Sequence, residues 1–396
     1  MSKHRKITFP GGDGAQLAAR LDLPAMPPRG YALFAHCFTC SKDSLAASRI
    51  SARLADLGFG VLRFDFTGLG DSDGDFSNTN FSSNIEDLVA AAHWMEAEGM
   101  APSLAIGHSL GGAAVIAAAK QLPMVKAFAT LGAPSEPGHL EEQLAGSTCQ
   151  IEKEGSAEVD LAGRQFLIRK QFLDDIRHDR VQKAASELRR PLLVMHAPLD
   201  ETVSIDNATQ IFLAARHPRS FVSLDEADHL LTRREDADYA ASVIAAWAGR
   251  YLPNDKGAQE SNEVKSGHVN VSESGWSLYQ NKVSTRDHVL FADEPTSLGG
   301  SNSGPSPFDL VSAALGACTS ITLRMYADRK NLPLEHVSVD ITREKQENGR
   351  VLFNRAVQIE GDIPENTRQR MVEIAEKCPV HRLLNGGADI RTTEST

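Results

Sequence analysis

The sequence predicts an α/β domain built on a mostly parallel sheet with helices on both faces, followed by a smaller α+β domain. Up to residue 252, short apolar runs typical of strands alternate with segments of helical spacing, and this alternation favours a parallel sheet covered on both faces. From residue 267 onward, strands and helices come in separate groups, which is typical of an α+β domain. The polar, aperiodic residues 253–266 between them indicate a linker.

Composition and charge exclude several classes of protein. The 396 residues are 41% hydrophobic and 23% charged, as in ordinary globular proteins rather than in disordered, collagen-like or coiled-coil chains. The net charge of −11 comes without a basic domain, so the electrostatic pattern of a nucleic-acid-binding protein is absent. No signal peptide and no apolar run of membrane-spanning length stands out, so we expect a cytoplasmic protein with no membrane partner. Five cysteines are too few for a disulfide scaffold, and we expect those that matter to be reactive thiols.

The elements of the first domain follow in order. Residues 1–25 predict an antiparallel hairpin at the sheet edge, with its turn at residues 11–14. The predicted strands of the main sheet are residues 31–38, 61–66, 103–107, 127–131, 191–196 and 220–224. The predicted helices are residues 50–57, 84–98, 110–121 and 239–251. The charged segment 134–190 interrupts the alternation and indicates either a small cap over one end of the sheet or an ordinary surface insertion.

The second domain, residues 267–396, centres on one apolar helix. Strands are predicted within residues 269–283 and at 287–291, before a loop rich in Gly, Ser and Pro. The helix predicted over 308–324 is apolar on nearly every side, which favours a buried central helix over an amphipathic one. Strands 337–343 and 351–360 and a helix over 366–378 complete this domain.

The pentapeptide Gly-His-Ser-Leu-Gly at residues 107–111 lies between a predicted strand and a predicted helix. This placement is typical of a nucleophile elbow, a sharp turn that lifts a serine hydroxyl clear of the backbone. Flanking glycines permit the turn because they lack a Cβ, and the following helix N-terminus favours developing negative charge. Ser109 is therefore the candidate nucleophile.

A serine nucleophile needs a base and a group that orients the base. Asp200 and His229 each follow the C-terminal end of a predicted strand, where open α/β sheets place their sites. Their order, Ser then acid then His, is typical of hydrolases with this elbow. Glu201, Asp225 and Asp228 are alternatives for the acid. His196 lies inside a predicted strand and is interpreted as a core residue.

The first 250 residues resemble the α/β-hydrolase superfamily. Besides the elbow, FAHCF at residues 34–38 resembles its oxyanion loop, and RFDFTGLGDS at 63–72 resembles the segment after its next strand. The resemblance implies a carboxylesterase or related acyl hydrolase, with the backbone amides of Phe38 and Leu110 as the oxyanion hole and no metal or organic cofactor. Cys37 stands where the family usually has glycine. With Cys40 it forms a C-x-x-C motif, which we interpret as part of the oxyanion loop rather than as a redox pair.

Cys318 and Cys378 carry the chemistry expected of the second domain. Their wide separation lacks the paired spacings of a zinc site, and two buried unreactive cysteines are the alternative. Residues 304–327 and the Cys-Pro-Val-His of 378–381 resemble the OsmC/Ohr family, the osmotically inducible and organic-hydroperoxide-resistance proteins. The resemblance implies an intertwined homodimer and a thiol-dependent peroxidase. Cys318 would become a sulfenic acid, and Cys378 would resolve it as a disulfide that a small dithiol or protein thiol reopens.

A thiol in an apolar helix needs a nearby cation to become a thiolate. The resemblance implies Arg286 for this role, with Arg324 as an alternative. The family's carboxylate that holds this arginine is replaced by Phe308, and Asp309 is the neighbouring candidate. We therefore expect a bifunctional esterase and thiol peroxidase. One alternative is an esterase whose second domain serves only dimerisation or binding, and another is a peroxidase whose hydrolase domain captures substrate.

Overall fold

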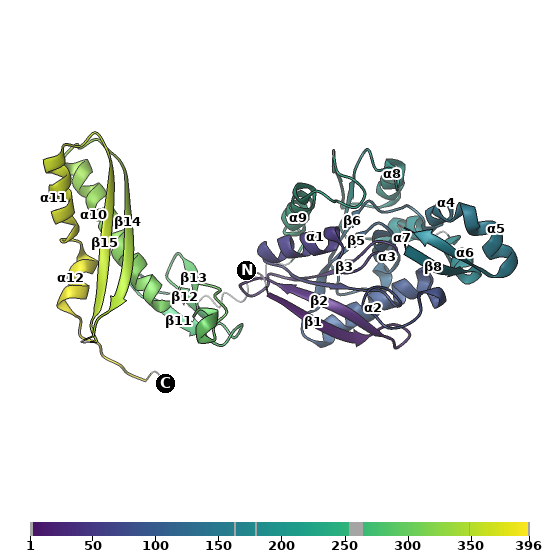
Figure 1. Cartoon of the computed structure of the whole chain (residues 1–396), viewed down its shortest axis with the longest axis horizontal. Helices are drawn as coiled ribbons and strands as arrows, with labels where there is room; N and C mark the ends of the chain where they lie inside the picture. The colour runs from purple at the N-terminus through teal and green to yellow at the C-terminus, as the bar shows by residue number, and fades with distance from the viewer. Residues whose placement is uncertain (1–2, 162–163, 179, 253–263, 348, 395–396) are drawn as a thin grey trace. The chain divides into compact units, whose positions relative to one another are not determined.

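The computed structural model describes residues 3–161, 164–178, 180–252, 264–347 and 349–394. The chain forms two compact units, residues 1–262 and 263–396 (Figure 1). Most of the predicted linker, residues 253–263, lies outside the described residues. Each unit is described by itself below.

The first unit is built on an eight-stranded sheet with the strand order β1-β2-β4-β3-β5-β6-β9-β10. Strands β1 and β2 form the predicted antiparallel hairpin, and β2 pairs antiparallel with β4. All other neighbours in the sheet are parallel, which confirms the predicted fold class. The strands are β1 (Lys3–Pro10), β2 (Gln16–Leu23), β3 (Tyr31–Ala35), β4 (Gly60–Phe64), β5 (Pro102–His108), β6 (Ala127–Leu131), β9 (Leu192–His196) and β10 (Arg219–Ser223).

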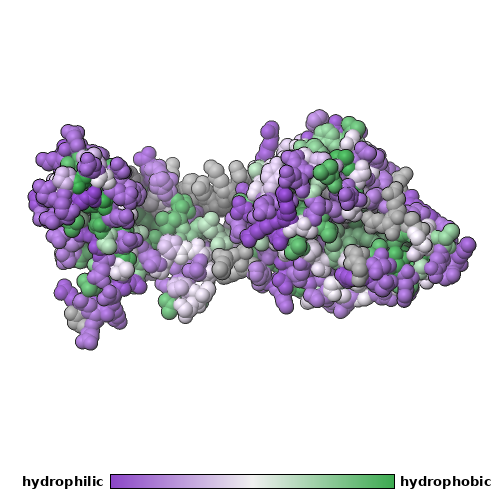
Figure 2. All heavy atoms as spheres, turned by 45° about the horizontal axis from the view of Figure 1, so that its top comes forward, coloured by the Kyte–Doolittle hydropathy of each residue, from purple (hydrophilic) through white to green (hydrophobic). Residues whose placement is uncertain are grey.

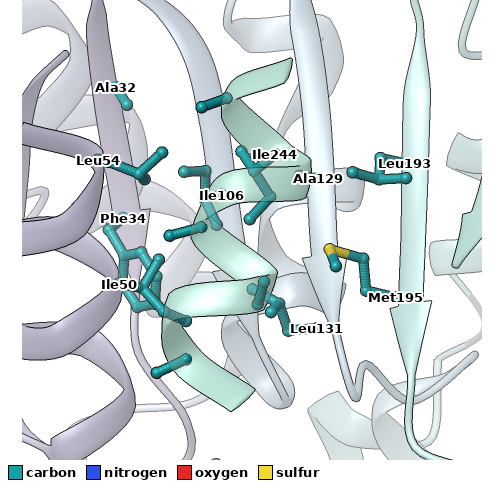
Figure 3. Close-up of a cluster of buried hydrophobic side chains, with 14 of the residues drawn as sticks. Ala32, Phe34, Ile50, Leu54, Ile106, Ala129, Leu131, Leu193, Met195 and Ile244 are labelled. Atoms are coloured by element: carbon teal, nitrogen blue, oxygen red, sulfur yellow. The ribbon is translucent and has the colours of Figure 1, made fainter. Parts of the chain in front are cut away.

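Helices cover both faces of this sheet. On one face, Figure 3 shows Ile50 and Leu54 of α1 and Ile244 of α9 meeting strand side chains such as Phe34 and Ile106. Strand residues that alternate with these, such as Leu33 and Phe128, are also fully buried, as expected when both faces are covered. The helices of the first unit outside the cap are α1 (Leu45–Asp56), α2 (Phe81–Ala97), α3 (Leu110–Ala117), α8 (Ile205–Ala214) and α9 (Arg234–Ala248).

The segment between β6 and β9 contains several short elements. Strands β7 (Ser156–Leu161) and β8 (Arg164–Arg169) form an antiparallel hairpin. Strand β8 contacts the short helix η1 (Phe76–Asn78), and α6 contacts α2. The predicted insertion is therefore a structured cap beside the loops that follow β3 and β4. Its helices are α4 (Leu140–Gln143), α5 (Ala145–Glu154), α6 (Lys170–Ile176) and α7 (Val181–Glu187).

The second unit combines two small antiparallel sheets with a long helix. Helix α10 (Pro307–Arg329) starts at a capping box in which Ser306 and Asp309 bond reciprocally. It runs beside the long hairpin of β14 and β15 (Figure 1) and contacts α11 and α12. The other elements are β11 (Asn270–Glu273), β12 (Asn281–Ser284), β13 (Val289–Ala292), β14 (Leu334–Lys345), β15 (Val351–Gly361), α11 (Glu365–Ala375) and α12 (Pro379–Gly386).

The sequence predicted that helix α10 is buried on nearly every side. Within one chain this prediction is wrong. Only Leu315, Thr319, Leu323 and Ala327 are buried, a stripe at every fourth residue, because the core they join is small. Phe308, Ile321 and Met325 are more than half exposed on other sides of the helix. In Figure 2, hydrophobic atoms reach the surface of this unit among hydrophilic ones. By length and composition alone α10 could cross a membrane, a feature that the sequence analysis did not anticipate.

Candidate active sites

Ser109 lies at the turn between β5 and α3, in the backbone conformation of a nucleophile elbow. Its φ of 54° and ψ of −125° are rare for a residue with a side chain, and such residues cost about 1–3 kcal/mol. A Cβ at Gly107 would overlap the backbone of Gly111, and a Cβ at Gly111 would overlap the carbonyls of Ala35 and His36. The two glycines of the motif are therefore required for the close approach of the strand, the helix and the loop after β3.

The structure brings Ser109, His229 and Asp200 into one chain of hydrogen bonds. His229 Nε2 lies 3.0 Å from Ser109 Oγ, and His229 Nδ1 lies 2.7 Å from Asp200 Oδ2. The backbone amides of Thr202 and Val203 donate to Asp200 Oδ1, each at 2.9 Å. Burial raises the pKa of Asp200, but the bond to His229 and these amides outweigh it and lower the pKa. Asp200 is therefore a carboxylate at neutral pH and can stabilise a positively charged His229.

The alternatives for the acid lie elsewhere. Asp228 accepts hydrogen bonds from the backbone amide and hydroxyl of Thr232, while Glu201 and Asp225 are exposed. Among the four candidates for the acid, Asp200 is the one whose carboxylate bonds to the His229 ring. His196 is fully buried, and its Nε2 lies 2.7 Å from the carbonyl oxygen of Val203, consistent with a core position.

His108 is a site residue that the sequence analysis missed. Its Nε2 lies 2.7 Å from the backbone carbonyl oxygen of His229. Burial, with the neighbouring His229, lowers the pKa of His108 to about 4, so its ring is neutral at pH 7 and can donate to this carbonyl. His108 thus positions the loop that carries His229. Its place next to Ser109 in the elbow was the available signal.

Phe38 and Leu110, the predicted oxyanion donors, line one small cavity together with His36, Cys37 and Gly111. Its volume is about 10 Å³, and side chains such as Phe66, Leu69 and Asn84 complete its wall. The Phe38 ring stacks on Phe172 of the cap, with centroids 5.3 Å apart. The cap therefore packs directly against the oxyanion loop.

Cys37 and Cys40 depart from the expectation that the C-x-x-C motif is not a redox pair, because the two cysteines are bonded. They are joined by a disulfide, with their Cα atoms 5.3 Å apart, within the usual range for such bonds. The two motif residues between them, Phe38 and Thr39, form the tip of the oxyanion loop. The interpretation of the motif as part of that loop agrees with its position.

Asp65, at the end of β4, ties the oxyanion loop to the loop that follows β4. It is fully buried and accepts from both the backbone amide and the ammonium of Lys42, at 2.5 and 2.7 Å. The backbone amide of Asp71 donates to the same carboxylate at 2.9 Å. Burial lowers the pKa of Lys42, but Asp65 and Asp71 outweigh it and raise the pKa. Asp65 therefore faces a positively charged lysine.

In the second unit, Cys318 of α10 and Cys378 at the start of α12 are free thiols, and they lie close enough for Cys318 to help lower the pKa of Cys378. Cys378 is fully buried, whereas Cys318 is half-buried. The Cys378 sulfur accepts from the backbone amide of His381 at 3.3 Å and lies 3.8 Å from Thr319 Oγ1. Burial raises the pKa of Cys378, but the His381 amide, Thr319, Cys318 and the charge of Arg355 together lower it.

The predicted pairing of Arg286 with Asp309 beside Cys318 is wrong within this chain. Arg286 is exposed and lies 3.6 Å from Asp287, in the turn between β12 and β13. Asp309 accepts from Ser306 at the start of α10, so its carboxylate serves the helix cap. The alternative, Arg324, donates to the carbonyls of Leu334 and Glu335.

Arg355 of β15 is the cation beside the thiols. Its Nη1 donates to Thr319 Oγ1 at 3.0 Å and to the carbonyl of Ala375 at 2.9 Å. Arg355 shares its strand face with Phe353, Val357 and Ile359, all partly buried at alternate positions. A cation within the apolar face of a strand was a signal that the sequence analysis did not use.

Comparisons with known proteins settle the family of the larger domain. The model of the alpha/beta hydrolase family matches residues 32–273. The chain belongs to the alpha/beta hydrolase family. The model of OsmC-like protein matches residues 300–393, which include Cys318 and Cys378. The hydrolase domain is therefore followed by an OsmC-like domain.

Solved structures similar to this chain cover the hydrolase domain. The esterase domain of a Rhodothermus marinus protein is 47% identical, with 63% of this chain and 99% of that chain covered and a TM-score of 0.52. A putative hydrolase from Agrobacterium vitis S4 is 21% identical (62% and 98% covered, TM-score 0.52). Est1E from Butyrivibrio proteoclasticus with ferulic acid bound is 19% identical (62% and 99% covered, TM-score 0.51). The last two show the hydrolase fold alone. No curated protein matches the chain.

Proposed function

We propose that the hydrolase domain is a serine carboxylic-ester hydrolase that works through Ser109, His229 and Asp200. The observation that carries the proposal is the continuous hydrogen-bonded chain from Ser109 Oγ through both ring nitrogens of His229 to Asp200. The 47% identity to an esterase domain supports an ester as substrate.

The reaction proceeds in two halves. His229 Nε2 takes the hydroxyl proton as Ser109 Oγ attacks the ester carbonyl, and Asp200 stabilises the imidazolium that forms. The backbone amides of Phe38 and Leu110 donate to the oxyanion, and such a donor contributes about 2.7–4 kcal/mol. His229 then protonates the leaving alcohol. In the second half it activates a water molecule, which releases the acyl group from Ser109.

A fluorophosphonate probe tests this proposal, because it labels only a serine that a neighbouring base activates. We expect stoichiometric labelling at Ser109 together with hydrolysis of p-nitrophenyl esters. The matched control is Ser186→Ala, because the Ser186 hydroxyl donates to the backbone carbonyl of Lys183, away from any histidine bond among the described residues. This variant should label and hydrolyse normally. Wild-type protein that neither labels nor hydrolyses any ester in a panel would overturn the proposal.

We further propose that the OsmC-like domain reduces organic hydroperoxides. The Cys318 thiolate attacks the peroxide oxygen, which releases the alcohol and leaves a sulfenic acid. Cys378 then displaces water to form the Cys318–Cys378 disulfide, and a small dithiol or protein thiol returns two electrons and two protons. The adjacent thiols support this scheme. The greater exposure of Cys318 favours it as the thiol that meets the peroxide.

Intact-mass measurement after one equivalent of cumene hydroperoxide tests the thiol chemistry. Wild type should lose two hydrogen atoms, and Cys378→Ser should gain one oxygen. Gain of oxygen by Cys318→Ser with none by Cys378→Ser would reverse the roles of the two thiols. An unchanged wild-type mass would leave the second candidate function, a domain that serves dimerisation or binding, which the exposed apolar residues of α10 favour.

A further inference from the structure

The disulfide between Cys37 and Cys40 encloses the proposed oxyanion donor. Phe38, whose backbone amide is that donor, lies between the two bonded residues. The backbone amide of Cys40 also donates to the carbonyl of Cys37 at 3.1 Å, so the four residues form one tight turn. Both Cys37 and Phe38 line the small cavity that also contacts Leu110, the residue after Ser109. The position of this amide is thus coupled directly to the disulfide.

The conformation of Thr39 makes the turn sensitive to loss of that bond. Its φ is 59°, a left-handed conformation that is a genuine outlier for a β-branched residue. Such conformations persist only where the surroundings impose them. The other restraints on the turn are a bond between His36 Nδ1 and the Cys37 carbonyl at 2.8 Å, a bond from Arg164 Nη1 to the Thr39 carbonyl at 3.3 Å, and contacts of the Phe38 ring with Phe76 and Phe172. The His36 bond holds the carbonyl side of the Cys37–Phe38 peptide, and of these restraints only the bond to the Thr39 carbonyl acts on the backbone of Thr39 itself.

The disulfide is also open to chemical attack from one side. Cys37 is buried at 5% exposure, whereas Cys40 is half-buried. A dithiol therefore attacks the Cys40 sulfur first, forming a mixed disulfide and releasing Cys37 as a thiolate. The second thiol of the reagent then displaces Cys40. The reagent loses two electrons and two protons and becomes a disulfide, and Cys37 and Cys40 become thiols.

We propose that the Cys37–Cys40 disulfide is a redox switch of the hydrolase site, active when bonded and weakened when reduced by a dithiol. Reduction lets Thr39 leave its left-handed conformation, and the Phe38 amide then leaves the oxyanion position. The inference rests on the proposed esterase function. Because an oxyanion donor acts mainly in the transition state, the loss falls on kcat rather than on KM.

The test uses the full chain, treated with dithiothreitol and desalted without air, and then assayed with p-nitrophenyl acetate. Alkylation and mass measurement count the thiols at Cys37 and Cys40 in each sample. Loss of one oxyanion donor typically lowers kcat about 100- to 1000-fold, and we expect a fall of about tenfold or more, reversed by reoxidation. Cys37→Ser/Cys40→Ser should be fixed at the low rate and unresponsive to the reductant. Cys149→Ser, which removes an exposed free thiol, should respond as wild type does.

Three results would overturn the switch alone. The first is a kcat within twofold of the starting value after both thiols are shown to be free. The second is a Cys37→Ser/Cys40→Ser variant with wild-type kcat. The third is equal rates of fluorophosphonate labelling at Ser109 in both states. A chain that labels in neither state would overturn the esterase assignment and the switch together.

Discussion

At the residue scale, hydrogen bonds from backbone amides and neighbouring side chains set the charge of Asp200 and Cys378. Asp200 stays ionised although buried, because His229 and two backbone amides lower its pKa. The pKa of Cys378 is lowered in spite of burial for a similar reason, since a backbone amide of α12 donates to its sulfur. In both sites the protein supplies preorganised donors, so ionisation needs no water at the group.

Ser109→Ala should abolish ester hydrolysis and leave the free energy of unfolding nearly unchanged, because only a hydroxyl at an elbow is removed. Asp200→Asn should retain residual hydrolysis, with kcat lowered by about 10⁴, since a neutral amide favours the wrong tautomer of His229. Steady-state kinetics and urea unfolding measure the two effects. Hydrolysis by Ser109→Ala at the wild-type rate would show that another residue is the nucleophile.

Arg355→Met should raise the pKa of Cys378, because a positive charge that favours the thiolate is lost. The measurement is the pH dependence of iodoacetamide alkylation of Cys378 in a Cys149→Ser/Cys318→Ser background, whose midpoint should move to higher pH. Arg286→Met is the matched control, since Arg286 is exposed and lies beside Asp287. A midpoint that stays in place in Arg355→Met would show that Arg355 does not favour the Cys378 thiolate.

His108 should make the hydrolase domain sensitive to acid. Its pKa in the folded state, about 4, lies below the ordinary value near 6.5, so the unfolded chain binds the proton more tightly. The stabilising effect of the neutral ring is complete above about pH 6.5 and is lost as pH falls toward 4, a loss of up to about 3 kcal/mol. Urea unfolding of the full chain, followed by tryptophan fluorescence at several pH values, should show this slope. His108→Gln should flatten it; an equal slope in both proteins would contradict the assignment.

At the scale of elements, the hydrolase site depends on loops that buried charges hold together. Asp65 at the end of β4 bonds to the backbone of both the loop after β3 and the loop after β4. Asp87 of α2 likewise accepts from the backbone of Thr67 and of Gly12 in the β1–β2 turn. The ends of several strands are thereby fixed relative to Ser109, although none of these carboxylates touches it.

Asp65→Asn should destabilise the hydrolase domain by about 1–3 kcal/mol, because the buried Lys42 ammonium loses one of its two close carboxylates and keeps Asp71. Ester hydrolysis should fall at the same time, since the oxyanion loop loses its anchor. Asp65→Asn/Lys42→Met should recover part of the stability, because the buried ammonium that Asp65 compensates is removed. Urea unfolding of wild type and the two variants measures the loss and the recovery of stability, and an ester assay measures the fall in hydrolysis. Equal stability in all three proteins would show that the Asp65–Lys42 pair is unimportant.

At the scale of the whole molecule, the two units differ in how completely they bury their apolar residues. The hydrolase unit has an extensive core on both faces of its sheet. The OsmC-like unit has one small cluster around Leu323 and Met371, and leaves Phe308, Ile321 and Met325 of α10 exposed. Exposed apolar side chains in this number favour association with another surface.

The full chain should therefore be a homodimer held by its OsmC-like domain. Ile321→Lys/Met325→Glu should shift it toward monomer, because charged groups would be buried at the contact, while ester hydrolysis stays at the wild-type level. Analytical ultracentrifugation at micromolar concentration measures the state of both proteins. A wild-type chain that sediments as a monomer would contradict the prediction, and equal dimerisation by the variant would place the contact elsewhere.

The sequence by itself determined the features that depend on local pattern. Alternating apolar runs and helical segments predicted the parallel sheet, and the edge hairpin followed from its glycine-rich turn. The pentapeptide around Ser109 located the elbow, and the strand ends located Asp200 and His229. These predictions from local pattern succeed because the period of a strand, the residues of a turn and the ends of parallel strands are fixed by short-range geometry.

The tertiary structure alone decided which distant residues meet. Arg355 reaches the thiols because β15 packs against α10 and α11, whereas Arg286, expected there from resemblance, lies in an exposed turn. The apolar circumference of α10 predicted burial, yet within the described residues only one stripe of the helix is buried. In each case the outcome depends on packing between segments far apart in sequence, which no local pattern contains.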